Sequence, residues 1–184
     1  MKLIMENFRR FISESEGAGN QVKFSGILKI MPSQDIIAQA QPLIDSLPEE
    51  AVPLGDDRLH VTLIHQSILK PYRKILKKIK ALPEPPQVKI DSKVIERVGK
   101  DVEEGRRSWV AKVENQEELK NYVKKFITML EEIQKMKQEF DLGKISEEDY
   151  VKAVKAAVGE KWKETVEAAD PEPNRVFHIS LANL

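Results

Sequence analysis

Arg58-Leu59-His60-Val61-Thr62-Leu63 and Val176-Phe177-His178-Ile179-Ser180-Leu181 are two stretches with one pattern: a histidine, an apolar residue, a hydroxyl residue and a leucine. Side chains alternate between the two faces of a β-strand, so in each stretch the histidine and the hydroxyl share one face and the apolar residues share the other. The chain has only three histidines, which makes the repetition informative. The sequence therefore predicts two strands that each present an imidazole and a hydroxyl on one surface and apolar side chains to a core.

Composition restricts the class of protein. With 184 residues the chain is long enough for one domain of ordinary size, with or without an appendage. Its 30 basic and 30 acidic side chains leave a net charge near zero, so no overall field attracts nucleic acid and any phosphate must be captured locally. The absence of cysteine excludes disulfides, thiolate nucleophiles and cysteine zinc sites. No apolar run approaches the roughly 20 residues of a membrane span, and we expect a soluble, cytoplasmic protein.

The first 20 residues differ from the rest and are predicted to form a separate tail. Met1–Ile12 can place apolar residues on one side of a short amphipathic helix, and residues 13–20 have the Ser, Glu and Gly content of a flexible linker. The simplest interpretation is a tail loosely docked on a domain that spans residues 21–184.

The first half of that domain is predicted to run strand, helix, histidine strand, helix. Gln21–Met31 alternates apolar and polar residues as a strand does. Ser33 can cap a following helix, which Pro42 is expected to kink or split because an interior proline costs about 3 kcal/mol. Leu59–Ile68 is predicted as the first histidine strand, and Lys70–Ala81 as a basic amphipathic helix.

The second half repeats this order. Strands are predicted over residues 88–98 and 108–114, a long helix over residues 116–138, and the second histidine strand at residues 176–181. Residues 136–173 interrupt the repetition, and their turn, capping signal and apolar stripe predict an inserted helical hairpin. Its role is either packing or dimerisation, or else that of a lid that selects substrate.

The two H-x-[T/S]-hydrophobic motifs and the near-duplicated element order resemble the two-histidine (2H) phosphoesterase superfamily. That superfamily includes the 2′-5′ RNA ligase-like proteins, the cyclic phosphodiesterases and the phage anti-CBASS nucleases. The resemblance implies an α+β, bilobal fold in which two pseudo-symmetric antiparallel sheets with flanking helices surround a central cleft. The tail adds a second resemblance: Ile12-Ser13-Glu14 is similar to the cleavage sequence of head-targeting peptides in tailed-phage internal proteins. This would imply a phage protein that acts in the host cytoplasm or is delivered with the virion.

Two facing imidazoles can hydrolyse a phosphodiester. The reaction needs a base that deprotonates the nucleophile and an acid that protonates the leaving oxygen, and histidine, with an ordinary pKa near 6.5, can supply either near pH 7. We therefore predict a metal-independent phosphodiesterase without a cofactor, in which His60 and His178 are catalytic. Which of them is the acid and which the base stays open, as does the direction of the reaction.

Four further residues are candidates for binding the substrate. The resemblance assigns phosphate binding to Thr62 and Ser180, whose hydroxyls can stabilise the charge that develops on the phosphate oxygens. Arg58 shares the face of His60 by strand parity and is a candidate supporting cation. Tyr72 is a candidate for stacking a base, although a place in the core is the more common role of such a residue. His65 lies an odd number of residues from His60 and is expected to be structural or on the surface.

The expected partner is a nucleotide, a cyclic oligonucleotide or an RNA end, with no membrane involved. The linkage, whether 2′,3′-cyclic, 2′-5′ or 3′-5′, is not fixed by the sequence. A binding protein that holds such a ligand without turnover is one alternative, although binding alone does not need two matched imidazoles. An internal virion protein whose histidines are incidental is another, and it would place the two histidines apart.

Overall fold

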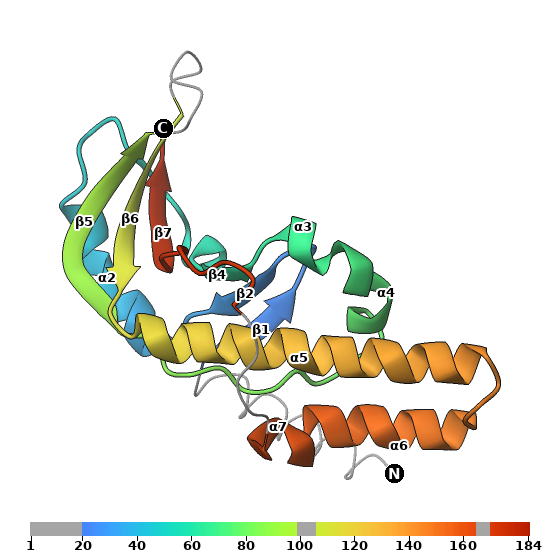
Figure 1. Cartoon of the computed structure of the whole chain (residues 1–184). Coiled ribbons are helices and arrows are strands. Elements are labelled where there is room, and N and C mark those ends of the chain that lie inside the picture. Colours follow the sequence, from blue (N-terminus) through green and yellow to red (C-terminus); the bar gives the residue numbers. More distant parts are fainter. Residues whose placement is uncertain (1–19, 99–105, 165–169) are drawn as a thin grey trace, which may run out of the picture.

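The computed structural model describes residues 20–98, 106–164 and 170–184 (Figure 1). The predicted N-terminal helix and the cleavage-like sequence at residues 12–14 lie outside these residues. Within them, no helix combines the length and the apolar character that a membrane crossing requires.

The strands form one antiparallel sheet, and the fold is α+β. The described strands are β1 Gln21–Phe24, β2 Leu28–Met31, β3 Val52–Pro53, β4 Val61–Ile64, β5 Ile90–Val98, β6 Arg107–Val113 and β7 His178–Asn183. Their order is β1-β2-β4-β7-β6-β5, and β3 pairs with β7. The final strand of the chain therefore lies between the two halves (Figure 1). Instead of the two sheets expected from the sequence, the halves share one sheet through β4 and β7.

Helices cover one face of this sheet. They are α2 Gln34–Asp45, α3 Gln66–Leu69, α4 Arg73–Leu76, α5 Gln116–Asp141, α6 Glu147–Val158 and α7 Glu160–Glu164, with short 3₁₀ turns η1 Asp56–Arg58 and η2 Lys70–Tyr72. The buried stripe of α5, which includes Phe126 and Leu130, belongs to the same apolar cluster as Val61 and Ile179 of the central strands. Removing these side chains from water is the main favourable term that holds α5 against the sheet.

The predicted strand Gln21–Met31 is a β-hairpin. β1 and β2 pair with Phe24 opposite Leu28, and a three-residue loop with Gly26 at a φ of 89° joins them. Because the loop has an odd number of residues, the even-numbered residues lie on the same face before and after the turn. The alternation of apolar and polar residues therefore continues unchanged through the turn. Gly26 is the residue that can adopt the positive φ at no steric cost.

Three other local predictions need correction. The first histidine strand is β4 alone, because the chain turns into α3 directly after His65. The basic helix predicted over Lys70–Ala81 is instead two short elements, the 3₁₀ turn η2 and the helix α4, and it ends at Leu76. Pro71, which lacks a backbone donor, lies in η2. Pro42 lies inside α2, which is one continuous helix and is therefore not split there. Ala38, whose carbonyl lacks a partner because Pro42 has no N–H, is exposed, so water can solvate that carbonyl.

The inserted helical hairpin is present and packs behind α5. The Ser146 side chain caps α6 by accepting from the Asp149 N–H at 3.1 Å, as predicted. Trp162 of α7 packs edge-on against Tyr122 and Phe126 of α5, with ring centroids 5.2 and 6.4 Å apart. Figure 1 shows α6 beside α5, on the side away from the strands. Within the described part of the hairpin, α6 and α7 pack onto α5 and do not cover the opposite face.

Candidate functional site

The two histidine motifs alternate in burial as a half-buried strand requires. In the first motif Leu59, Val61 and Leu63 are fully buried, whereas His60 and Thr62 are partly exposed. The second motif repeats this: Phe177, Ile179 and Leu181 are buried, whereas His178 and Ser180 are partly exposed. Because the buried residues face α5, the four motif side chains lie on the opposite face of the sheet.

Pairing between β4 and β7 brings the two motifs together. Val61 lies opposite Ile179 in the antiparallel register. One residue to either side, this register places His60 opposite Ser180 and Thr62 opposite His178, so the imidazoles occupy diagonal positions. Diagonal neighbours in a sheet have Cα atoms roughly 7–8 Å apart, within reach of two rings on one bound phosphate. The positive charge that His60 can carry is also among the causes that lower the pKa of His178.

A backbone carbonyl orients the His60 ring. Its Nδ1 lies 2.7 Å from the carbonyl oxygen of Arg58. A carbonyl can only accept, so Nδ1 carries a proton and donates it. Nε2 is therefore the atom that is left to exchange a proton with a substrate.

The surroundings of His178 favour its neutral form. Its Nε2 lies 2.9 Å from a terminal nitrogen of Arg97, and Nδ1 lies 3.3 Å from the carbonyl of Val176. The same guanidinium nitrogen lies 3.4 Å from Nδ1, so Arg97 contacts both ring nitrogens and is nearer to Nε2. The Val176 carbonyl can only accept, so a neutral ring that bonds to it carries its proton on Nδ1 and its lone pair on Nε2. Burial lowers the pKa of His178, and the charges of Arg97, Arg175 and His60 lower it further, against the hydrogen bond to Val176.

Arg97 is a site residue that the sequence did not reveal. It lies on β5, which is separated from β7 by β6, and its side chain is exposed apart from its contact with His178. Nothing in the sequence around Arg97 repeats a motif. Only the order of the strands and the curvature of β5, which is visible in Figure 1, bring this side chain to the second histidine.

A row of polar and basic residues crosses the four central strands. Lys29 of β2 pairs with Thr62, and Lys112 of β6 pairs with His178. Residues opposite one another in a sheet share a face, so both lysines flank the histidines over roughly 14 Å, at about 4.8 Å per strand. Among the described residues, the hydroxyls of Thr62 and Ser180 have no hydrogen-bond partner and are free to bind a ligand.

The supporting residues predicted from the sequence lie elsewhere or act differently. Arg58 ends η1 rather than lying in a strand, so the parity argument does not apply; its carbonyl orients His60, and its side chain is exposed. Tyr72 packs against the apolar core near Glu131 of α5, and burial raises its pKa, with Glu131 contributing. The structure therefore gives Tyr72 a packing role away from the histidines. His65 is exposed directly before α3, as expected.

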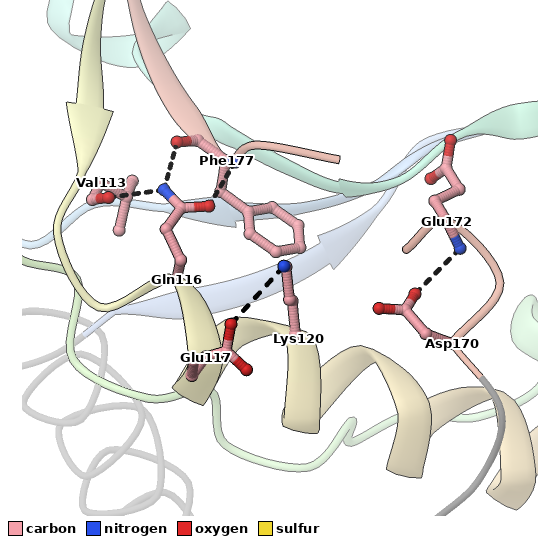
Figure 2. Close-up of polar contacts among 7 residues, drawn as sticks. All are labelled: Val113, Gln116, Glu117, Lys120, Asp170, Glu172 and Phe177. Carbon is pink, nitrogen blue, oxygen red and sulfur yellow. Dashed lines mark hydrogen bonds and ion pairs between the residues drawn. The ribbon is translucent and has the colours of Figure 1, made fainter. Parts of the chain in front are cut away.

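The side chains of Gln116 and Arg175 hold residues 175–177, directly before His178, through hydrogen bonds. Figure 2 shows the carboxamide of Gln116 bonded to the backbone of Phe177: Oε1 accepts from its N–H at 2.7 Å, and Nε2 donates to its carbonyl at 2.8 Å. Gln116 thereby continues the backbone ladder at the point where β6 has ended. Arg175 donates to the Thr62 carbonyl and to Glu172, each at 2.7 Å, and so joins the same segment to β4.

We expect Gln116→Ala to destabilise the fold and displace His178. The substitution leaves the N–H of Phe177 without its acceptor, and an unsatisfied buried group costs about 1–3 kcal/mol. Urea unfolding should show this loss in the free energy of unfolding. Gln138→Ala, on the exposed side of the same helix, is the matched control and should change stability little. Equal stability of both variants would show that the Gln116 carboxamide does not support β7.

A pocket in the described part of the chain lies beside α7, away from these histidines. It has a volume of about 660 Å³ and is lined by Pro83, Glu84, Val158, Gly159, Glu160, Trp162, Lys163 and Glu164. Three carboxylates against one ammonium disfavour a phosphate there. Elsewhere in the described ranges, no three His, Cys, Asp or Glu side chains converge as a metal site requires.

No protein-family model, no curated protein and no solved structure matches this chain. The arrangement of its own residues therefore carries the functional argument.

Proposed function

We propose that this chain is a phosphodiesterase of the two-histidine type, which hydrolyses a phosphodiester or cyclic phosphate in a nucleotide or oligonucleotide. One observation carries the proposal: the pairing of β4 with β7 gathers two imidazoles and two hydroxyls on one exposed surface. The strands β1, β2 and β4 would form one lobe and β5, β6 and β7 the other, with the substrate bound over their junction. Lys29 and Lys112 support an anionic substrate because they flank this surface.

The geometry favours His178 as the base and His60 as the acid. Burial and the neighbouring cations lower the pKa of His178, which favours the neutral ring that can take a proton from water. As water loses its proton to His178, its oxygen bonds to phosphorus. The bond to the leaving oxygen breaks, and that oxygen takes a proton from Nε2 of His60. The products are a phosphomonoester and an alcohol, and Thr62 and Ser180 bind the non-bridging oxygens.

A panel of substrates tests this function. The purified protein is incubated with 2′,3′-cyclic, 2′-5′, 3′-5′ and cyclic oligonucleotides, with and without EDTA, and the products are separated by chromatography. We expect cleavage of at least one linkage at a rate that EDTA leaves unchanged, because a protonated imidazole supplies the leaving-group proton. Calorimetric binding without any product would replace the enzyme with a nucleotide-binding protein. The absence of both binding and cleavage would remove the proposal.

The pH dependence should report the free His178. The logarithm of kcat/KM is expected to rise with pH along an acid limb whose midpoint lies below 6.5, the ordinary pKa of histidine. The direction follows because a lowered pKa keeps the base unprotonated, and hence active, down to a lower pH. Rates measured between pH 4.5 and 8 in buffers of constant ionic strength would check it. A midpoint above 6.5 would contradict the assignment of His178 as the base.

A further inference from the structure

In the free protein, the atom that must accept the proton of water is already occupied. Nδ1 of His178 is turned toward the Val176 carbonyl, so only Nε2 is available for chemistry, and Arg97 donates to that Nε2 at 2.9 Å. The same guanidinium nitrogen lies 3.4 Å from Nδ1, so it rests against the ring beside both nitrogens and closest to Nε2. A guanidinium at 2.9 Å from Nε2 occupies space that an attacking water would need.

Arg97 also makes a weaker contact than its chemistry allows. A guanidinium bonds most strongly to a carboxylate or phosphate, in a two-pronged geometry. Among the described residues, no acidic side chain pairs with Arg97, whose described partner is a neutral ring. A phosphate oxygen brought near His178 would therefore be the better partner.

The other charged groups around His178 favour the same exchange. Arg175, directly before β7, is already bonded to Glu172 and to the Thr62 carbonyl and stays in place. His60, directly before β4, is near enough for its charge to lower the pKa of His178, and Lys112 lies opposite His178 on β6. These groups are cations or can become cations, so a phosphate group entering here meets attraction from every strand packed against His178.

We propose that Arg97 is a substrate-responsive cap on the base: it holds Nε2 of His178 in the free protein and transfers to the phosphate oxygens when an anionic phosphodiester binds. This inference rests on the proposed function and deepens it. The negative charge of the substrate then both anchors the substrate and uncovers the base. A neutral phosphotriester of the same shape would leave the base covered.

The test measures the His178 ring directly. The imidazole resonances of His178 are titrated by NMR in the unaltered protein, in Arg97→Ala and in Arg97→Lys, with and without inorganic phosphate. Arg107→Ala is the matched control, because Arg107 lies on β6 in an ion pair with Glu96 at 3.5 Å. We expect Arg97→Ala to raise the pKa of His178 in the free protein and to weaken phosphate binding roughly 10-fold to 100-fold, the value of a charge-assisted hydrogen bond.

Kinetics separate this role from a structural one. Arg97→Ala should raise KM more than it lowers kcat and should move the acid limb of kcat/KM to higher pH, whereas Arg97→Lys should recover part of the loss in KM. If Arg97→Ala behaves like Arg107→Ala in both the His178 titration and phosphate affinity, the cap is wrong, even where cleavage is observed. If the titration and affinity change as expected but no substrate is cleaved, the cap stands and the proposed function fails.

Discussion

His60→Ala and His178→Ala are each expected to lower kcat/KM for a nucleoside 2′,3′-cyclic phosphate by two to four orders of magnitude, about the contribution of one positioned acid or base. In the proposed mechanism each imidazole does a separate task, and neither task has a substitute among the motif residues. Both rings are partly exposed and lie outside the apolar cluster, so the fold should survive the loss of either. The rate of product formation and the circular dichroism spectrum, measured on the same samples, check both statements.

His65→Ala is the matched control for this experiment. It removes the third histidine, which is exposed directly after β4 and has no place in the mechanism. Its kcat/KM should equal that of the unaltered protein. Full activity in His60→Ala or in His178→Ala would remove the paired-imidazole mechanism.

The two histidine variants should respond differently to a better leaving group. A p-nitrophenolate anion departs without a proton, whereas a ribose hydroxyl needs one from the acid. On a nucleoside 3′-(p-nitrophenyl phosphate), His60→Ala should therefore recover most of the activity that it loses on the 2′,3′-cyclic phosphate, whose leaving group is a ribose hydroxyl. His178→Ala should not recover, because water still needs a base. The release of p-nitrophenolate is followed by its absorbance.

This comparison decides which histidine carries which proton. Recovery in His178→Ala alone would reverse the assignment that Arg97 and Arg175 support through their charges. Loss of equal size on both substrates in both variants would show that neither ring acts as an acid on the leaving oxygen. The double variant serves as the baseline, because residues that act as a unit do not contribute additively.

Tertiary contacts also correct what local patterns predicted about the supporting residues. Arg58 was assigned by strand parity, but the chain around it is a 3₁₀ turn, so its carbonyl acts in place of its side chain. Tyr72 has the character of a stacking residue, yet burial against the core removes it from the histidine face. Parity holds only where the chain is extended, and aromatic residues serve cores as readily as ligands.

The sequence by itself determined which side chains share a face. A period of two is a local property of extended backbone, so His60 with Thr62 and His178 with Ser180 could be assigned to a solvent-facing surface before any fold was known. The long helix α5 and the Ser146 cap followed in the same way from local patterns and capping chemistry.

Only the tertiary structure decided which faces meet. The hairpin at Gly26 could not be recognised from the sequence, because its three-residue loop leaves the alternation of apolar and polar residues unchanged. The insertion of β7 between β4 and β6 joins the two motifs, and strand order together with the curvature of β5 brings Arg97 to His178. The physical reason is that strand pairing is set by burial summed over the whole core, and residues distant in sequence contribute to that sum as much as neighbours do.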